Sequence, residues 1–417
     1  MKVTKLVVLL LILAAPGLLW ATGAQEKEYE LHYLTPQVGA ESSAKMIATL
    51  VDEWNAANAG EARVVIDGVP DYTQYLNALK TKIAADQGPD FFYYNDPIDK
   101  PDFWAYKKLG DMTPFVDKEF LAADTEQDWS DCKIGDKIYA FPYIKLMTML
   151  FYNKEHFQRA GIAAPIPTWD EWFAAGDKLK ALGVSPFAGM NTDNSWTVML
   201  MYSAYVGSAG GPNVWKGVKN FNDPVWLDGV RFLKKLWDYT TPDSVNLPYQ
   251  AASANYLSGK ASMIANGPWM IAQIKSEGMY EKTGYMPYPG VKGKGLIVQA
   301  GPLGKMSTFY KNDQDPAKMK LVVDFMKYHN NIENTKRLVL ASAGAYATTA
   351  TFTDADPLEP LLKELYGWIN KVPWTIPYFS EAVLGFEVPF TEELGLLWTN
   401  KVTPEDFIKH MNAKVFK

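Results

Sequence analysis

The sequence predicts an α/β protein made of two lobes, and two observations lead to this prediction. The chain has 417 residues, more than one hydrophobic core usually serves, so we expect two lobes of roughly 150 to 200 residues each. The N-terminal part alternates strand patterns with helix patterns over short links. This order demands parallel strands joined by right-handed crossovers.

Five segments carry the alternation. Apolar residues recur with a period of two in residues 29–33, and short β-branched or aromatic runs follow at 63–66 and 91–94, as is typical of strands. Between the strands, apolar residues at helical spacing form two stripes: Ile47, Leu50, Val51 and Trp54, then Tyr72, Tyr75, Leu76, Leu79 and Ile83. This part of the chain therefore predicts one α/β lobe.

Later helices begin at recognisable capping residues. Thr168-Trp-Asp-Glu171 has the spacing of a capping box, in which each end side chain bonds the backbone of the other. We expect Trp169 and Trp172 of this helix to lie in the core. Three further sites place a polar N-cap residue before a proline suited to the first helical turn: Asp223-Pro224, Asp315-Pro316 and Thr403-Pro404.

The N-terminus has the pattern of an export signal. Two lysines precede an apolar run at residues 6–20, which is too short for a membrane span, and small residues follow it. We expect cleavage after Ala24, with Ala21 and Gly23 as alternatives, so that residues 1–24 form a removable signal peptide.

Cysteine occurs once, as Cys132. No cysteine lies at the cleavage site, so a lipid anchor cannot be attached there, and an internal disulfide cannot form. A protein exported without an anchor is retained only by an outer membrane. We therefore expect a periplasmic protein whose one thiol is inert and partly buried.

Composition excludes some ligands and favours others. The formal net charge is −6, which argues against a nucleic-acid partner because such proteins present a basic face. Only 4 of the 41 basic residues are arginines, and they are scattered, whereas guanidinium groups usually clamp carboxylate and phosphate ligands. Aromatic residues make up 14% of the chain. Aromatic faces together with Asp, Asn and Gln suit a neutral, polyhydroxylated ligand.

Signatures of catalysis and metal binding are missing from the sequence. The histidines are isolated along the chain and lack metal-ligand spacing: His32, His156, His329 and His410. A glycine-containing segment near residues 301–307 departs from a phosphate loop, because Gln299 and Met306 stand at required positions. We expect no metal, no cofactor and no enzymatic activity. A glycoside hydrolase remains the alternative, since paired carboxylates depend on the fold.

Several segments together resemble one family. They are Gly135-Asp-Lys-Ile-Tyr-Ala-Phe-Pro-Tyr143, Leu150-Phe-Tyr-Asn-Lys-Glu155, Ala160-Gly161, Pro167-Thr-Trp-Asp-Glu171 and Leu257-Ser-Gly-Lys-Ala-Ser-Met-Ile-Ala-Asn-Gly-Pro-Trp269. Their order and spacing resemble the solute-binding proteins of carbohydrate ABC importers, the maltodextrin-binding protein family. The resemblance implies a two-lobed periplasmic-binding-protein fold, with three crossings between the lobes and a ligand cleft between them.

The resemblance also implies where the chain divides. Crossings are expected near Ile144, near residues 300–304 and near residues 342–346. The N-terminal lobe would then hold residues 27–145 and 303–342, and the C-terminal lobe residues 146–302 and 343–417. Hinge bending at the crossings would close the lobes on a sugar, and the permease would recognise the loaded monomer. A ligand-loaded sensor of a membrane receptor would use the same cleft and stays open as an alternative.

Asn266-Gly267-Pro268-Trp269 is the segment most suggestive of a binding role. Gly and Pro interrupt the chain after a Met-Ile-Ala strand, so Trp269 should project from the end of that strand. Ligands of open α/β sheets bind at such an edge. An indole there offers a flat partner to the apolar face of a sugar ring, and the resemblance assigns the Trp of this motif to sugar stacking.

A second set of candidates follows the strand at residues 91–94. The resemblance matches Asp96 to a sugar-binding aspartate, with Asn95 beside it. A carboxylate accepts two hydroxyl hydrogen bonds and so can fix the orientation of a sugar. The alternative is that Asp96-Pro97 only caps the turn that follows.

Three further residues complete the predicted ligand set. Gln37 follows the first strand, where relatives present polar groups, although the Asp-Lys pair of maltodextrin-type proteins is missing there. Trp196 precedes an apolar helix and could stack on ligand or pack at the start of that helix. Trp374 lies in a late segment from which relatives add an aromatic residue, and core packing is its alternative.

Overall fold

The computed structural model describes residues 28–416 except 40, 42, 96–97, 99–104, 106, 123–128, 130, 343–351, 353–354, 370, 373–374, 377–382 and 384. Its strands are β1 (Tyr29–Thr35), β2 (Ala62–Gly68), β3 (Phe91–Tyr94), β4 (Lys133–Ile134), β5 (Lys137–Ile138), β6 (Phe141–Asn153), β7 (Ser185–Phe187), β8 (Ala261–Asn266), β9 (Thr283–Met286), β10 (Val298–Thr308) and β11 (Thr375–Ile376).

The helices are α1 (Ala44–Ala57), α2 (Tyr72–Ala84), α3 (Lys118–Leu121), α5 (Lys154–Ala160), α6 (Trp169–Ala181), α7 (Trp196–Gly210), α8 (Pro224–Leu236), α9 (Tyr249–Leu257), α10 (Ile271–Ser276), α11 (Pro316–His329), α12 (Ile332–Ser342), α13 (Pro360–Ile369), α15 (Glu387–Trp398) and α16 (Pro404–Val415). The predicted signal peptide, residues 1–24, lies outside the described residues, as does most of the third expected crossing. Among the described helices, none is both long and apolar enough to cross a bilayer.

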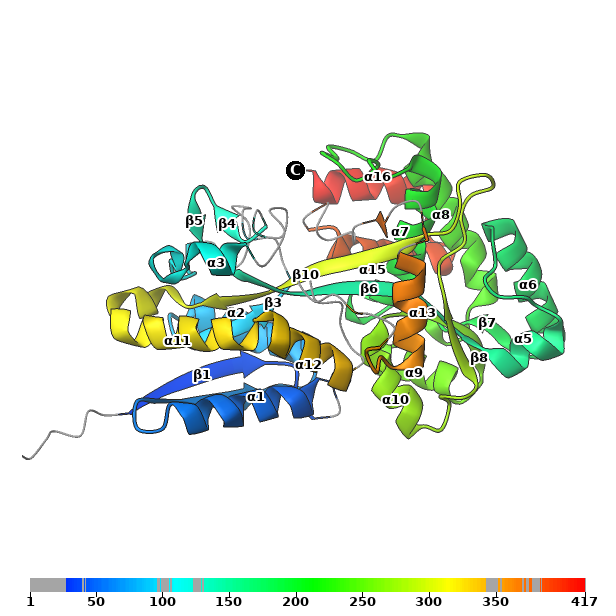
Figure 1. Ribbon diagram of the computed structural model, residues 1–417. Coiled ribbons are helices and arrows are strands. Elements are labelled where there is room, and N and C mark those ends of the chain that lie inside the picture. Colours follow the sequence, from blue (N-terminus) through cyan, green and yellow to red (C-terminus); the bar gives the residue numbers. More distant parts are fainter. Residues whose placement is uncertain are drawn as a thin grey trace, which may run out of the picture.

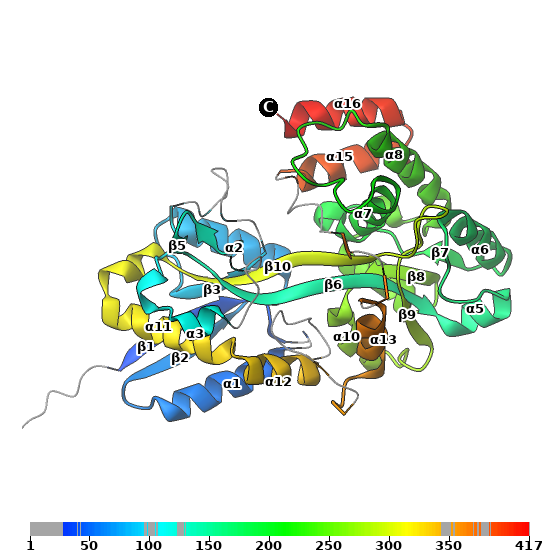
Figure 2. The ribbon, with the colours of Figure 1, turned by 45° about the horizontal axis from the view of Figure 1, so that its top comes forward.

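One mixed sheet runs through the molecule. Its strand order is β2-β1-β3-β10-β6-β8-β7, with β11 paired to β10 and β9 paired to β6. Strand β1 pairs in parallel with both β2 and β3, as the alternation of strands and helices predicts. The long strands β6 and β10 are antiparallel, and Figure 1 and Figure 2 show them side by side, running from one half of the molecule into the other.

Buried apolar side chains form separate cores at the two ends of the long strands. The first core draws on residues 31–144 and 306–338, and it includes Ile144 of β6. The other end holds two clusters that include Met147 and Leu150 of the same strand. The predicted α/β fold of two lobes is therefore confirmed. We call these halves the first and the second lobe, and β6 and β10 connect them.

Most side chains predicted to be in the core are buried. In the stripe of α2, Tyr75, Leu79 and Ile83 are buried, whereas the prediction is wrong for Tyr72, which is exposed at the first turn of the helix, and Leu76 is half-buried. The apolar stripe of α1 faces inward as expected: Ile47, Leu50, Val51 and Trp54. Trp169 and Trp172 of α6 are 3% and 0% exposed, which confirms their place in the core. Cys132 is fully buried within the first core, deeper than the partial burial predicted from sequence.

The predicted helix starts are present, with one correction. Thr403 and Asp406 form a complete capping box at the start of α16. At α6 only half of the expected box forms, because the Glu171 carboxylate accepts from the Thr168 hydroxyl at 2.8 Å instead of from the Thr168 backbone. Capping carboxylates bond backbone N–H groups at the starts of α8 and α11: Asp223 and Asp315.

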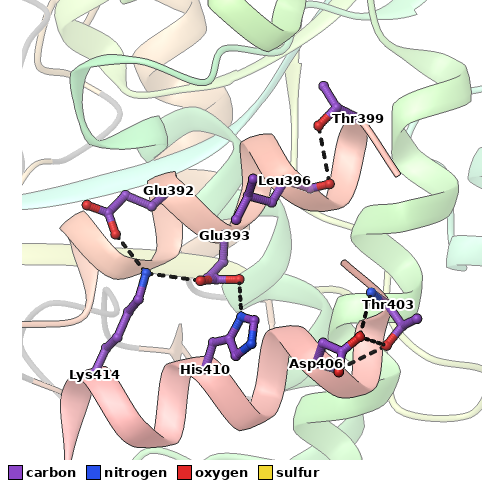
Figure 3. A network of polar contacts seen from close by, with 8 residues as sticks. All are labelled: Glu392, Glu393, Leu396, Thr399, Thr403, Asp406, His410 and Lys414. Atoms are coloured by element: carbon purple, nitrogen blue, oxygen red, sulfur yellow. Dashed lines mark hydrogen bonds and ion pairs between the residues drawn. The ribbon is translucent and has the colours of Figure 1, made fainter. Parts of the chain in front are cut away.

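A buried carboxylate joins the last two helices (Figure 3). Glu393 of α15 is 1% exposed. One of its oxygens lies 2.9 Å from Nδ1 of His410, and the other accepts from Nζ of Lys414 at 3.0 Å, both on α16. Removing a charge from water is unfavourable unless it is paired. The two partners therefore allow Glu393 to be buried and fix the position of α16 on α15.

Candidate functional site

Trp269 lies where strand β8 ends. The strand stops at Asn266, Gly267 is extended with φ −111° and ψ 175°, and residues Pro268–Met270 form a single 3₁₀ turn. The Trp269 side chain is half-buried. Its indole folds back over Gly267, since a Cβ added there would lie 1.9 Å from Cζ3 of Trp269. The sequence correctly predicted the strand end and the interruption after it.

Trp196 and Trp269 meet, and a third aromatic residue joins them. Their ring centroids are 5.8 Å apart with planes inclined at 54°. Tyr249, the first residue of α9, lies with its ring 4.9 Å from that of Trp196 at 44°. All three side chains are half-buried. We call Trp196, Tyr249 and Trp269 the aromatic trio; Tyr249 was not predicted, because its sequence context marks only a helix start after proline.

Asn266 fixes the strand end beneath the trio. It is fully buried. Its Nδ2 donates to the Tyr249 hydroxyl at 3.1 Å, its Oδ1 accepts from the Gly267 N–H at 2.8 Å, and its carbonyl accepts from the Tyr285 hydroxyl at 2.8 Å. Burial raises the pKa of Tyr249, and polar contacts from Asn266, Ser253 and Trp269 lower it in part. The Tyr249 hydroxyl therefore stays protonated near neutral pH.

The chain before Trp196 adopts an unusual backbone. Asp193, Asn194 and Ser195 have φ angles of 51°, 64° and 53° in succession. Non-glycine residues rarely adopt this left-handed region, and residues held there cluster at binding sites and clamps. The Ser195 hydroxyl donates to Oδ1 of Asn191 at 3.0 Å, and Oδ2 of Asp193 accepts from the Tyr249 N–H at 2.9 Å.

In the first lobe, Gln37 and Asn95 follow neighbouring strands. Strands β1 and β3 are parallel partners, so the residues after them lie at one edge of the sheet. Gln37 is 8% exposed and its N–H donates to Oγ1 of Thr35 at 3.2 Å. The side-chain oxygens of Gln37 and Asn95 are buried and find no hydrogen-bond partner within the described part of the chain. Asp96 and Trp374 lie outside the described residues.

Three buried tyrosines lie near this edge: Tyr33, Tyr93 and Tyr143. The sequence placed them in strands or family segments, and none of them was predicted to belong to the ligand site. The rings of Tyr93 and Tyr143 are 5.8 Å apart in an edge-to-face contact. Burial raises the pKa values of Tyr33, Tyr93 and Tyr143, so all three stay neutral. The hydroxyls of Tyr33 and Tyr143 are buried near the side chains of Thr35 and Gln37, but within the described part of the chain neither makes a hydrogen bond of ordinary geometry. Buried polar atoms of this kind are usually satisfied by water or ligand.

The charged residues in the described part of the chain pair mainly with one another on the surface. No group of three or more His, Cys, Asp and Glu side chains in the described ranges could hold a metal ion. His32 is not isolated in space as the sequence implied, since Glu30 and Asp67 each lie 3.1 Å from one of its ring nitrogens. Three of the four arginines pair with carboxylates on the surface: Arg63, Arg231 and Arg337.

The structure thus brings Trp196 and Trp269 together in the second lobe and places Gln37 and Asn95 at one sheet edge of the first. Aromatic faces on one side and unpartnered amide and hydroxyl groups on the other can hold a polar, uncharged molecule that has apolar faces. Three of the four guanidinium groups, which would favour an anion, are engaged with carboxylates elsewhere.

Comparison with known sequences finds relatives that match most of the chain. The chain is 25% identical over 379 residues to the multiple sugar-binding protein of Streptococcus mutans, covering 86% of each chain. It is 26% identical over 325 residues to the sn-glycerol-3-phosphate-binding periplasmic protein of Yersinia pseudotuberculosis, covering 72% of this chain and 71% of the other.

Comparison of folds also finds binding proteins. The structure resembles that of a chitin oligosaccharide binding protein with a TM-score of 0.80 and 24% identity, covering 93% of this chain and 98% of the other. The family model for bacterial extracellular solute-binding proteins matches residues 40–336. That match spans more than half of the sequence and agrees with the resemblance noted in its motifs. This chain belongs to the bacterial extracellular solute-binding protein family.

Proposed function

We propose that this protein binds a neutral carbohydrate between its two lobes and delivers it to an ABC permease. The observation that carries the proposal is the aromatic trio, three half-buried rings in contact at the end of β8. A sugar ring has apolar faces that pack on aromatic rings, while its hydroxyls require hydrogen-bond partners. The trio lies in the second lobe and supplies aromatic rings for the apolar faces of the sugar.

The first lobe offers hydrogen-bond partners for the sugar hydroxyls. Gln37 and Asn95 offer amide oxygens that accept hydrogen bonds from sugar hydroxyls, and we propose that Asp96 adds a carboxylate beside them. Trp374 is proposed as a further aromatic contact. The scarcity of free arginine favours an uncharged sugar over a phosphate ester, even though one relative carries glycerol phosphate in its name.

Binding and release would use hinge bending between the lobes. We propose N-terminal-lobe boundaries of 27–145 and 303–342, and C-terminal-lobe boundaries of 146–302 and 343–417. Strands β6 and β10 connect the lobes without a flexible tether, so rigid-body bending is the motion they allow. A ligand that contacts both lobes favours the closed form. Small-angle scattering should then give a smaller radius of gyration when sugar is bound.

The proposal extends to cellular location, export and partner. We propose a periplasmic, monomeric, non-enzymatic protein, exported by a signal peptide cleaved after Ala24 without a lipid anchor. The permease would recognise the spacing of the two lobe surfaces. A sensor of a membrane receptor would bind the same ligand with a different partner. Incubation with oligosaccharides distinguishes a binder from a hydrolase, because a binder returns them intact.

A ligand screen tests the proposal. We expect maltotriose, raffinose or a chitin trisaccharide to raise the melting temperature of the mature protein, because ligand stabilises the folded state by mass action. Calorimetric titration should then give micromolar or tighter affinity, about −8 kcal/mol or more favourable. Stabilisation by sn-glycerol 3-phosphate or by carboxylated ligands alone would contradict the assignment to neutral sugar.

A further inference from the structure

The segment Asp193–Ser195 adopts a conformation that its residue types do not favour. Three consecutive non-glycine residues have φ angles between 51° and 64°. Such a turn persists only where surrounding contacts hold it. Two contacts do so: the Asn191 side chain accepts from the Ser195 hydroxyl, and the backbone N–H of Asn191 bonds the Leu247 carbonyl at 3.2 Å. The turn directly precedes Trp196 and sets the start of α7.

The Asp193 carboxylate ties this turn to a distant part of the chain. Its Oδ2 accepts from the backbone N–H of Tyr249 at 2.9 Å, across 56 residues. Tyr249 begins α9 after Pro248, so its N–H has no partner within the helix. The carboxylate therefore satisfies the free N–H at the start of α9 and locates Tyr249 beside Trp196.

The Tyr249 hydroxyl carries the link onward to Trp269. It accepts from Nδ2 of Asn266 at 3.1 Å, and Oδ1 of the same Asn266 side chain accepts from the N–H of Gly267, over which the Trp269 ring lies. Trp269 in turn contacts Trp196, which follows the turn at Asp193. The contacts therefore form a closed ring from Asp193 through Tyr249 and Trp269 to Trp196 and back.

We propose that the Asp193 carboxylate and the Tyr249 hydroxyl are positioning groups that hold the rings of Trp196 and Trp269 in their binding geometry before ligand arrives. This inference rests on the proposed function and adds a specific claim to it, since the effect of Asp193 and of the Tyr249 hydroxyl on affinity passes through the two indoles. Groups fixed in the bound arrangement avoid the ordering cost of binding. Loosening either residue therefore weakens binding, although the chemistry that meets the ligand stays the same.

A double-mutant cycle tests the proposal. Affinity for the tightest binder among maltotriose, raffinose and a chitin trisaccharide is measured by calorimetry for Tyr249→Phe, Trp269→Ala and the pair. Tyr249→Phe should weaken binding roughly 3- to 30-fold, the range for losing one buried hydrogen bond. In the Trp269→Ala background the same change should have a clearly smaller effect than in the wild type, because only the contribution through Trp196 remains and coupled residues are not additive. Equal effects in both backgrounds would overturn the proposal.

Asp193 provides a second test, with a conservative substitution that should restore binding. Asp193→Ala should weaken binding to a similar degree, and Asp193→Asn should retain most of the affinity because its amide oxygen still accepts from Tyr249. Matched controls in the same lobe are Asp223→Ala, which also loses a carboxylate bond to a backbone N–H, and Tyr288→Phe, which loses a hydroxyl bond to Thr148. Both controls should leave affinity unchanged. A loss of affinity in the controls equal to that at Asp193 and Tyr249 would reduce the claim to general destabilisation and reject it.

A spectroscopic measurement on the empty protein separates this inference from the proposed function. The Trp196–Trp269 contact should add an exciton band to the circular dichroism of the protein, and this band is the difference between the wild type and Trp269→Ala, because other tryptophan pairs contribute equally to both spectra. Asp193→Ala and Tyr249→Phe should weaken this band, and the two controls should not. An unchanged band in both variants would overturn the positioning role whatever the ligand is. If Trp269→Ala keeps full sugar affinity while the band still depends on Tyr249, the proposed function fails and the positioning contact stands.

Discussion

The indole of Trp269 lies directly over the α-carbon of Gly267, two residues earlier, where a Cβ would come within 1.9 Å of the ring. The backbone at Gly267 is extended and open to any residue, with φ −111° and ψ 175°. Glycine is therefore required at this position by the packing of the tryptophan rather than by backbone conformation. The contact aligns the ring at the end of β8.

This relationship gives the first prediction. Gly267→Ala should displace the Trp269 ring and weaken sugar binding by at least about tenfold, or roughly 1.4 kcal/mol. Gly367→Ala is the matched control, since its added Cβ meets nothing within 4 Å and it lies within helix α13. That control should keep full affinity and gain up to about 1 kcal/mol in free energy of unfolding from helix propensity. Calorimetry and urea denaturation of the two variants decide the point, and unaltered binding by Gly267→Ala would refute it.

The substitution Gln37→Leu should lower affinity for sugar without lowering the stability of the empty protein. Its side-chain oxygen is buried and lacks a partner among the residues described. Gln37→Leu removes that acceptor, so the free energy of unfolding of the empty protein should stay the same or rise by about 1 kcal/mol. Affinity should fall about tenfold or more, because a sugar hydroxyl loses its acceptor.

Gln299 is the matched control for this change. Both polar atoms of its fully buried amide lack partners within the described chain. Gln299→Leu should therefore stabilise the empty protein to a similar degree and leave affinity unchanged. Should Gln37→Leu bind sugar as tightly as the wild type, Gln37 would be removed from the ligand set.

His329 predicts a dependence of stability on pH. Burial lowers the pKa of this fully buried side chain from about 6.5 to about 4, despite a contact at 2.8 Å with Oδ1 of Asn330. Between these values the unfolded chain binds a proton that the folded protein does not, so stability falls as pH falls. From pH 7 to pH 4.5 this group should contribute a loss of about 2 to 3 kcal/mol in the free energy of unfolding.

The variant His329→Phe isolates that contribution. Phenylalanine fits among the neighbouring rings of Tyr33, Tyr143 and Phe325 and does not titrate. Urea denaturation at pH 7 and pH 4.5 should show a smaller loss for the variant than for the wild type, by about 2 to 3 kcal/mol. Equal losses in the two proteins would mean that His329 is charged in the folded state.

Much of the fold could be predicted because it depends on local patterns. The stripe from Ile47 to Trp54 has helical spacing that only one buried face explains, and the strand at 91–94 is apolar throughout. The same reasoning placed Trp269 at a strand end, since Gly267 and Pro268 interrupt the pattern. These features involve residues close in sequence, and their spacing alone specifies the structure.

The site could be predicted only in part because it depends on long-range contacts. Tyr249 reaches Trp196 and Asp193 across more than 50 residues, and its own sequence shows only a tyrosine after a proline. The left-handed turn at residues 193–195 has no glycine to announce it. The capping box at Thr168 is only half formed because the Glu171 carboxylate accepts from the Thr168 hydroxyl and not from the Thr168 backbone N–H. The spacing of the two residues is the same in both cases, so the sequence cannot distinguish them.

We expect Trp269 and Asp96 to bind sugar from opposite lobes, and calorimetric titration of their alanine variants measures both contributions. Asp96 lies outside the described residues, so its role stays a prediction from the sequence. Trp269→Ala should cost roughly 2 to 4 kcal/mol of binding free energy, as losing an aromatic anchor does. Asp96→Ala should cost about 1.5 to 3 kcal/mol, as expected for charge-assisted hydrogen bonds. The empty variants should melt close to the wild-type temperature. Retained affinity together with a loss of roughly 3 to 5 kcal/mol in unfolding free energy would show instead that Trp269 is a core residue.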